Sequence, residues 1–296
     1  MAKPRTSTNP YMVPPVTYEE YSPRYKNLFN MSRTEDGIIT AKWCNTEDHT
    51  KSAMWDQPLH RAIGQLCTDI GQDVEAEVLI LGGEGDDWLA TIHSTEKEDD
   101  EGKKWLSWEH MYYDGTNITD GLLNALHIPT IGVINGTGFH TEMATMCDIT
   151  LIAEEAMICD PHFYPSNMVP GDGIQIAFQM AMGVTKANYA MLTCQQFTAQ
   201  QAVEAGLANE VVPRAQIYDR AMEIAKQLLE TPRQVRRQTT DLLRTPWREA
   251  WSKNGRIAFG YEMWSYVAGT ETHDGGGGKQ DEMMKEMGAS MEAFDA

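Results

Sequence analysis

Residues 129–153, PTIGVINGTGFHTEMATMCDITLIA, predict a strand, a short helix and a second strand in immediate succession. The strands are expected at 129–135 and 148–153, because both are short apolar runs rich in β-branched residues. The helix is expected between them, at 141–146. Strands that alternate with helices are typical of an α/β fold.

The same alternation continues on both sides of this stretch. On the N-terminal side we expect a strand, a helix, a strand and a helix at 37–43, 58–70, 76–83 and 105–126. On the C-terminal side we expect helices at 174–182, at 199–206 behind a capping Thr198, and from about 218 to 267. The sequence therefore predicts an α/β core with a helical C-terminal portion.

Composition divides the chain into four parts. Residues 1–24 are rich in Pro, Tyr, Ser and Thr and are expected to form an N-terminal arm. Residues 25–212 are assigned to the α/β core and residues 213–270 to the helical region. Residues 271–296 contain four consecutive glycines and a Met/Glu-rich end, which favours a flexible, loosely tethered tail, with a short subunit-contact helix as the alternative. The charged run at 94–104 is expected to be a solvated loop.

The bulk numbers exclude several classes of function. With 42% hydrophobic and 23% charged residues, the 296-residue chain has the composition of a globular enzyme. Its formal net charge of -19 argues against nucleic acid or an anionic membrane as a partner. The N-terminus lacks the apolar core of a signal peptide, and the five cysteines form no CxxC pair. We therefore expect a cytoplasmic protein with reduced thiols.

The loop at 159–173, CDPHFYPSNMVPGDG, contains the main candidates for catalysis, His162 and Asp172. A neutral imidazole can accept a proton near neutral pH, and a carboxylate on its other nitrogen fixes the tautomer. The simpler alternative is a surface histidine and a turn aspartate that have no connection with each other.

Several segments together resemble one family. They are VLILGGEG at 78–85, IPTIGVING at 128–136, CDITLIAEEA at 147–156, VPGDG at 169–173 and AVEAGLANEVVP at 202–213. In order and spacing they are similar to the crotonase (enoyl-CoA hydratase/isomerase) family over roughly residues 35–265. The resemblance implies a crotonase-like ββα spiral core and a homotrimer or homohexamer.

The chain departs from the CoA-dependent members where they bind the thioester carbonyl. Those members carry a glycine-rich stretch after Asn-Gly, from which a backbone N–H helps to form an oxyanion hole. This chain has TGFHTE at 137–142, and its counterpart to the other oxyanion segment, WLATIH at 88–93, lacks the usual glycine and acid. By the same resemblance, Glu142 falls at the first catalytic glutamate of a hydratase and His162 at the second.

These departures resemble the 6-oxocamphor hydrolase and cyclic β-diketone hydrolase branch of the family. That branch carries a Pro-His-Phe…Pro-Ser…Val-Pro-Gly-Asp-Gly segment, matched at 161–173, and a histidine after Asn-Gly, matched by His140. It also carries a Lys-Ser-x-x-Trp-x-x-x-x-His segment, matched at 51–60 by Trp55 and His60.

The resemblance implies a hydrolase that needs no cofactor and cleaves a C–C bond of a β-diketone by a retro-Claisen reaction. His162 would be the base and Asp172 its orienting carboxylate. His140 and His60 would bind carbonyl oxygens or relay a proton, and the Trp55 indole would donate a hydrogen bond. Glu262 would reach the pocket from the C-terminal helices. The apolar diketone would be bound by further aromatic and methionine side chains, namely Phe139, Trp88, Phe163, Tyr164 and those of helix 178–182.

Four alternatives stay open. Glu142 favours a CoA-thioester hydratase, isomerase or hydrolase. His140, His162 and Asp172 are also a possible metal-ligand set, although the implied chemistry needs no metal. A binding protein without activity is a third alternative. Within C–C bond chemistry, retro-aldol cleavage or decarboxylation is the fourth.

Overall fold

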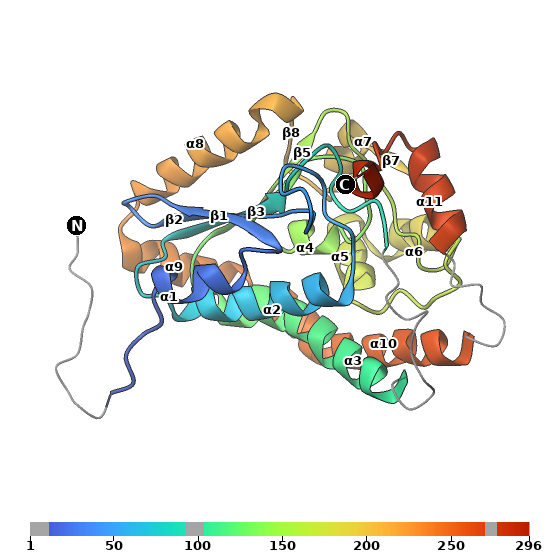
Figure 1. The fold of residues 1–296 in the computed structure, drawn as a ribbon, viewed down its shortest axis with the longest axis horizontal. Helices are drawn as coiled ribbons and strands as arrows, with labels where there is room; N and C mark the ends of the chain where they lie inside the picture. The colour runs from blue at the N-terminus through green and yellow to red at the C-terminus, as the bar shows by residue number, and fades with distance from the viewer. Residues whose placement is uncertain (1–11, 93–103, 270–276, 296) are drawn as a thin grey trace.

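A six-stranded sheet runs through the centre of the protein in the computed structural model, which describes residues 12–92, 104–269 and 277–295 (Figure 1). The first pair of strands is antiparallel and every other pair is parallel. In spatial order the strands are β1 (Phe29–Arg33), β2 (Ile38–Trp43), β3 (Val78–Gly83), β4 (Thr130–Ile134), β5 (Ile149–Ala153) and β8 (Glu210–Val212).

Helices cover both faces of this sheet (Figure 1). Helix α8 (Ile217–Leu229) lies on one face, and α2 (Gln57–Gln72), α3 (Lys104–Asp120) and the π-helical turn η3 (Gly121–Ala125) lie on the other. Every residue of β3 and β4 is buried as a result, which explains why both strands are continuous apolar runs without alternation.

The predicted strand–helix–strand unit is confirmed, because α4 (Glu142–Thr145) connects β4 to β5. Thr198 caps α7 (Ala199–Ala205) as predicted, since its side chain accepts from Gln201 N–H while the Gln201 side chain accepts from Thr198 N–H. Two more helices, α5 (Ile174–Met182) and α6 (Val184–Thr193), precede it. A second sheet consists of only β6 (Met157–Ile158) and β7 (Phe197–Thr198).

The C-terminal portion is helical, as the sequence predicts, but its single expected pattern is divided among three helices. After η4 (Arg214–Gln216) and α8 come α9 (Arg233–Leu243) and α10 (Thr245–Gly269). Arg244, between the last two, is 1% exposed and donates to Asp148 and to the carbonyls of Leu126 and Ile128. Arg244 therefore connects the start of α10 to the segments that precede β4 and β5.

The segment before residue 25 is partly folded onto the core, which corrects the expectation of a free arm. Residues 18–24 form α1 (Tyr18–Tyr21) and η1 (Ser22–Arg24). Tyr21 is completely buried, and its hydroxyl donates to Asp73 across 3.1 Å. Residues 1–11 lie outside the described part of the chain, as does most of the charged run at 94–104.

Residues 277–295, which we call the C-terminal strap, are not a flexible tail. They form α11 (Gly277–Glu286) and η5 (Glu292–Asp295). Met284, Met287 and Met291 are buried in one apolar cluster with Phe139 and Cys159. The prediction of a flexible tail was wrong because the glycine run suggested a linker, although regularly spaced methionines follow it. Residues 270–276 lie outside the described part.

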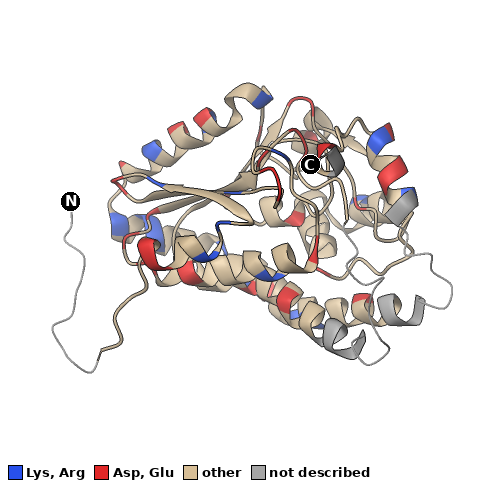
Figure 2. Ribbon diagram, viewed as in Figure 1, with Lys and Arg blue, Asp and Glu red and all other residues tan. Residues whose placement is uncertain are grey.

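Charged side chains lie mainly on the outer helices and loops, with both signs interspersed along α8 (Figure 2). The strands of the sheet are largely uncharged in the same view. Among the described residues, no helix has both the length and the apolar character that crossing a bilayer requires. All five cysteines are free and buried.

Candidate active site

Backbone pairing connects the loops that follow the carboxyl ends of β2, β3 and β4 to one another and to β6. Trp55 pairs with Ile92, Asp87 with Thr137, and Gly138 with Ile158. Open parallel sheets commonly place their ligands at this edge. The structure brings the candidate residues Trp55, His140 and His162 together here.

His140, His162 and Asp172 form the centre of the site. Asp172 Oδ2 lies 2.8 Å from His140 Nδ1 and 3.7 Å from His162 Nε2, and each of the three side chains is about 90% buried. His140 has a φ of 56°, the left-handed region that side chains other than glycine rarely adopt. Such backbone strain is often found at functional sites.

His162 takes its close carboxylate partner from Asp160, which the sequence analysis missed. Asp160 Oδ1 lies 2.7 Å from His162 Nδ1 and also accepts from the His162 backbone N–H across 3.1 Å. Asp160 is 1% exposed, so solvent does not weaken this contact. The expected pairing of His162 with Asp172 is therefore corrected: Asp172 faces the opposite ring nitrogen and its short contact is to His140. Asp160 stands two residues before the histidine in Asp-Pro-His, where an acid could have been noticed.

Two buried glutamates complete the group. Glu142 Oε1 lies 3.1 Å from His140 Nδ1, so this residue pairs locally with a site histidine. Glu262 from α10 accepts from Gly171 N–H across 2.9 Å, and its other oxygen lies 3.9 Å from His162 Nε2. Both side chains are 4% exposed.

The excess of carboxylates keeps protons on the two central histidines. Burial lowers the pKa of His140, but Glu142 and Asp172 outweigh burial and raise it to about 9. Burial likewise opposes the charged form of His162, whereas Asp172 and Asp160 raise its pKa well above the usual value. Burial alone would raise the pKa of Asp172, but the two imidazoles hold it below the usual range.

The glutamates have the opposite tendency. Burial, with the charge of Asp172 added, raises the pKa of Glu142 to about 7 and that of Glu262 to about 8. At neutral pH, therefore, Glu262 is mostly a carboxylic acid that can donate a proton. Environments that separate the pKa values of neighbouring groups in this way are typical of acid–base catalysis.

An aromatic wall stands beside His140. The indole ring of Trp55 lies 4.3 Å from the imidazole, ring centre to ring centre, and Phe139 lies 5.0 Å away. His60 stands behind Trp55, edge to face at 5.1 Å, with Phe259 on its other side. Burial, together with the charge of His140, lowers the pKa of His60 to about 3, so this imidazole is neutral. Its Nδ1 has no hydrogen-bond partner among the described residues.

The other residues proposed from the sequence are either packed in the main core or exposed to solvent. Trp88 is fully buried in the main core against Trp43. Phe163 and Tyr164 are 49% and 61% exposed. In α5, Phe178 belongs to the main core and Met180 is exposed, so that helix adds no methionine wall.

The centre of the site also has the composition of a metal-ligand set. Each of three residues offers one donor atom, and these atoms all lie within 4.8 Å of one another: His140, His162 and Asp172. Two imidazoles and a carboxylate suit a divalent transition metal, and Asp160 on His162 Nδ1 is the kind of partner that orients a ligating histidine. The same donors therefore fit either proton transfer or metal binding. Activity in the presence of a chelator distinguishes these two roles.

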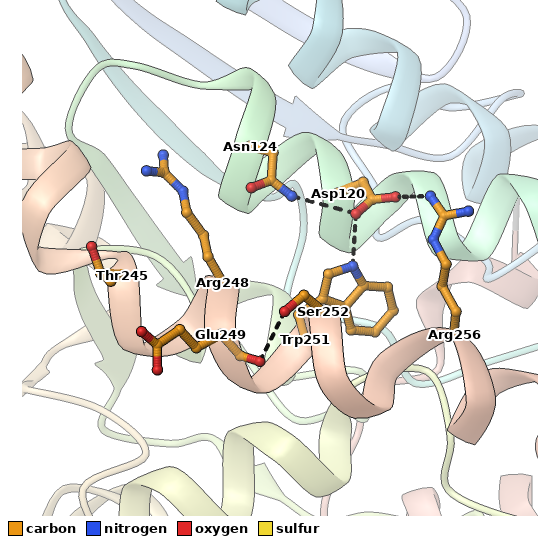
Figure 3. A pocket seen from close by; sticks show the side chains of 8 residues that line it. All are labelled: Asp120, Asn124, Thr245, Arg248, Glu249, Trp251, Ser252 and Arg256. Carbon is orange, nitrogen blue, oxygen red and sulfur yellow. Dashed lines mark hydrogen bonds and ion pairs between the residues drawn. The ribbon is translucent and has the colours of Figure 1, made fainter.

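A separate hollow of about 430 Å³ lies between the end of α3 and α10 (Figure 3). Its Asp120 carboxylate accepts from the Trp251 indole and from Arg256, and Asn124 points toward it. Arg248 is paired with Asp241. The charges in this hollow are thus compensated, and none of the candidate catalytic residues lines it.

A family model described as enoyl-CoA hydratase/isomerase matches residues 56–273. The chain belongs to this family. The predicted crotonase resemblance is confirmed, and so is the crotonase fold, with its mixed sheet and long C-terminal helix.

Two relatives by sequence have names that refer to CoA or fatty acid chemistry. The hydroxycinnamoyl-CoA hydratase-lyase of Pseudomonas fluorescens is 30% identical over 71% of this chain and 75% of its own length. The fatty acid oxidation complex subunit alpha of Shewanella frigidimarina is 26% identical over 68% of this chain, which spans only 28% of that larger protein.

One similar solved structure is named for a different reaction. The β-diketone hydrolase of the cyanobacterium Anabaena sp. PCC 7120, bound to (S)-3-oxocyclohexyl acetic acid, is 29% identical. Its TM-score is 0.76, with 83% of this chain and 96% of that chain covered. An enoyl-CoA hydratase/isomerase from Mycobacterium paratuberculosis has a TM-score of 0.71 at 23% identity, a likeness of fold alone.

Proposed function

We propose that this crotonase is a C–C bond hydrolase that cleaves a β-diketone by a retro-Claisen reaction to give a keto acid. The observation that carries the proposal is the buried group of His140, His162, Asp172 and Glu262. It stands where CoA-dependent members are expected to bind a thioester carbonyl. The β-diketone hydrolase from Anabaena holds a cyclic ketone with a carboxylic acid group. Hydrolysis of one C–C bond in a bicyclic diketone gives a molecule of that kind.

In this mechanism, the neutral form of His162 activates water, and the fraction of enzyme in this form grows as pH rises because the neighbouring carboxylates raise the pKa of His162. Asp160 occupies Nδ1, so the nitrogen left to accept a proton is Nε2. The gaps of 3.7 and 3.9 Å from Nε2 to Asp172 and Glu262 are too long for direct hydrogen bonds. A water molecule bound beside Nε2, off the lines that join it to these carboxylates, would lie within hydrogen-bond distance of the base. Its oxygen attacks one carbonyl carbon while its proton passes to Nε2.

His140 stabilises the negative charge that develops. Both of its carboxylate contacts use Nδ1, which leaves Nε2–H to donate to a substrate oxygen. With a pKa raised to about 9, the ring is cationic at neutral pH and a stronger donor than a neutral imidazole. Loss of one such donor typically costs about 10²- to 10³-fold in kcat.

Collapse of the alkoxide breaks the C–C bond. The electron pair of that bond passes to the carbon between the two carbonyls and forms an enolate. Glu262, held protonated by its burial, delivers a proton to this carbon. The proton on His162 Nε2 then returns to Glu262, 3.9 Å away, so both groups regain their starting states. The net reaction adds one water across the C–C bond.

The direct test follows the loss of enol(ate) absorbance when the protein meets bicyclic and monocyclic 1,3-diketones. The reaction contains EDTA and no CoA, and mass spectrometry identifies a product heavier by one water. His162→Ala is expected to abolish turnover with little change in the thermal midpoint. Turnover by His162→Ala equal to the wild type would disprove the assignment of the base. Activity that EDTA removes and a divalent ion restores would replace the proton-transfer mechanism with a metal-assisted one.

A CoA-dependent hydratase is the second candidate, and Glu142 favours it. Its Oε2 is buried without a hydrogen-bond partner among the described residues, and its pKa is raised to about 7. If the protein hydrates an enoyl-CoA and Glu142→Gln removes that activity, the CoA assignment replaces the diketone one. For diketone cleavage we expect Glu142→Gln to reduce kcat less than His162→Ala does.

A further inference from the structure

The C-terminal strap packs on the aromatic wall of the site. Met284, Met287 and Met291 share an apolar cluster with Ala90 and Phe139, and Trp55 packs against the same cluster. Phe139 and Trp55 are the two aromatic neighbours of His140. The methionines therefore stand behind the side chains that face the reacting groups.

Two acids anchor the end of the strap to the loops after β2 and β3. Asp87 accepts from Ser290 N–H, Ser290 Oγ–H and Met291 N–H at 2.8 to 2.9 Å. Glu292 Oε1 in turn accepts from Ser52 N–H, Ser52 Oγ–H and Asp86 N–H at 2.6 to 3.0 Å. Hydrogen bonds to charged acceptors are strong, so these six hold the end of the strap firmly in place.

The helix of the strap also contacts the loop that carries His162. Ser166 donates to Gln280 across 2.9 Å, and both side chains are buried. Cys159 Sγ lies 3.7 Å from Met287 Sδ, and Cys194 Sγ lies 3.6 Å from Met283 Sδ. One segment thus holds both the His140 wall and the His162 loop.

This segment lies beyond the part of the chain that the family model matches, which ends at residue 273. Its methionines pack on Ala90 and Phe139. These two residues belong to the segments 88–93 and 137–142, where CoA-dependent relatives are expected to carry their oxyanion donors. The strap therefore occupies space next to the place where a thioester would bind.

We propose that the C-terminal strap sets the size of the substrate pocket, in which Met287 and Met291 support Phe139 and Trp55 from behind and so limit the length of the alkyl substituent on the diketone. The size limit rests on the proposed function. The closed position of the strap does not depend on the reaction, so the closed position and the size limit can be tested separately.

Thiol protection tests the closed position without any substrate. Native protein is treated with N-ethylmaleimide, and peptide mass spectrometry gives the alkylation rate of each cysteine. Cys159 is fully buried under the strap, whereas Cys67 and Cys147 lie elsewhere and serve as internal controls. Glu292→Ala removes one anchor and is expected to speed alkylation of Cys159 roughly tenfold or more, because local opening becomes more frequent.

The matched control is Glu282→Ala, an exposed glutamate on the same strap. It should leave every alkylation rate at the wild-type value. If Cys159 is alkylated at the same rate in both variants, the strap does not close over the site and the proposal fails. Equal acceleration at Cys67 would indicate global unfolding and would also overturn it.

Substrate size tests the selection itself. We would compare kcat/KM for cyclic 1,3-diketones whose 2-alkyl group grows from methyl to hexyl. Met287→Ala and Met291→Ala should each raise the ratio of long-chain to short-chain kcat/KM about tenfold. Met191→Ala, in the main core, is the control and should leave that ratio unchanged. An unchanged ratio in both strap variants rejects the size limit, whereas a wild type that cleaves no diketone rejects the proposed function and leaves the thiol result standing.

Discussion

His162 Nδ1 lies 2.7 Å from Asp160 Oδ1, within the same short Asp-Pro-His segment, while Asp172 faces the other ring nitrogen. The two carboxylates therefore act on one imidazole from opposite sides. Asp160 holds the ring so that Nε2 points into the site. Asp172 lies near Nε2 and is shared with His140. A substitution at either acid should shift the pH profile of kcat/KM. A loss of folded structure would instead lower kcat/KM without moving the profile.

Asp160→Asn should move the rising limb of kcat/KM to lower pH. A base must be neutral, so activity rises with pH as His162 loses its proton. The wild-type midpoint is expected above the usual histidine value of about 6.5, because Asp172 and Asp160 raise the pKa of His162. Removal of the Asp160 charge lowers this pKa. The plateau should also fall, on the order of 10²-fold, because the asparagine no longer fixes the tautomer.

The pH profile of kcat/KM from pH 5 to 10 provides the measurement. Asp219→Asn makes the same chemical change at an exposed position of α8 and should leave the profile unchanged. A midpoint that stays in place or moves upward in Asp160→Asn would show that His162 is not the titrating base.

Glu262→Gln should remove the falling limb of the same profile. Burial, with Asp172, raises the pKa of Glu262 to about 8, so the wild type loses its proton donor as pH rises through that value. Glutamine can still accept from Gly171 N–H but carries no transferable proton. We expect kcat to fall roughly 10²- to 10⁴-fold and to lose its decline above pH 8. A variant with near wild-type kcat would move proton delivery to another group.

The long apolar elements were predictable from the sequence, and the shortest ones were not. β3 and β4 are buried on both faces, so their strand character is visible as continuous apolar runs. β6 and β7 have two residues each, too few for any periodicity to be seen. Their pairing depends on contacts between distant segments, which no local pattern contains.

The members of the candidate site were easier to predict than their pairing. His140, His162 and Asp172 do lie together, but the chain order does not say which nitrogen faces which carboxylate. That choice depends on the left-handed backbone at His140 and on the turn after Asp160. The strap was missed because four glycines typically mark a linker. Its spaced methionines are buried only once the loop after β3 supplies the anchoring acid Asp87.

Arg244→Met should destabilise the fold by about 3–5 kcal/mol, because it removes a buried guanidinium, leaves the mostly buried Asp148 without its ion-pair partner and leaves several carbonyls without a donor. Urea unfolding provides the free energy. Arg256→Met, whose guanidinium is 60% exposed and paired with Asp120, is the control and should cost about 1 kcal/mol or less. Since Arg244 contacts none of the site residues, the folded variant should keep its kcat. Equal costs for the two variants would contradict a structural role of Arg244 at the start of α10.

His60→Gln should make the protein less sensitive to acid. Burial and the charge of His140 lower the pKa of His60 to about 3 in the folded state, against about 6.5 in an unfolded chain. Between these values the unfolded chain binds a proton that the folded protein does not. Stability is therefore fully present above pH 6.5 and is lost as pH falls, by about 2 kcal/mol at pH 5.

Glutamine is neutral throughout this range, so the difference in unfolding free energy between pH 7 and pH 5 should shrink by that amount in His60→Gln. Urea unfolding at the two pH values measures it, whatever the variant loses in packing. His110→Gln, at an exposed position of α3, is the matched control and should leave the difference as in the wild type. If His60→Gln also leaves it unchanged, the pKa of His60 is the same in the folded and the unfolded chain, and the lowered pKa is wrong.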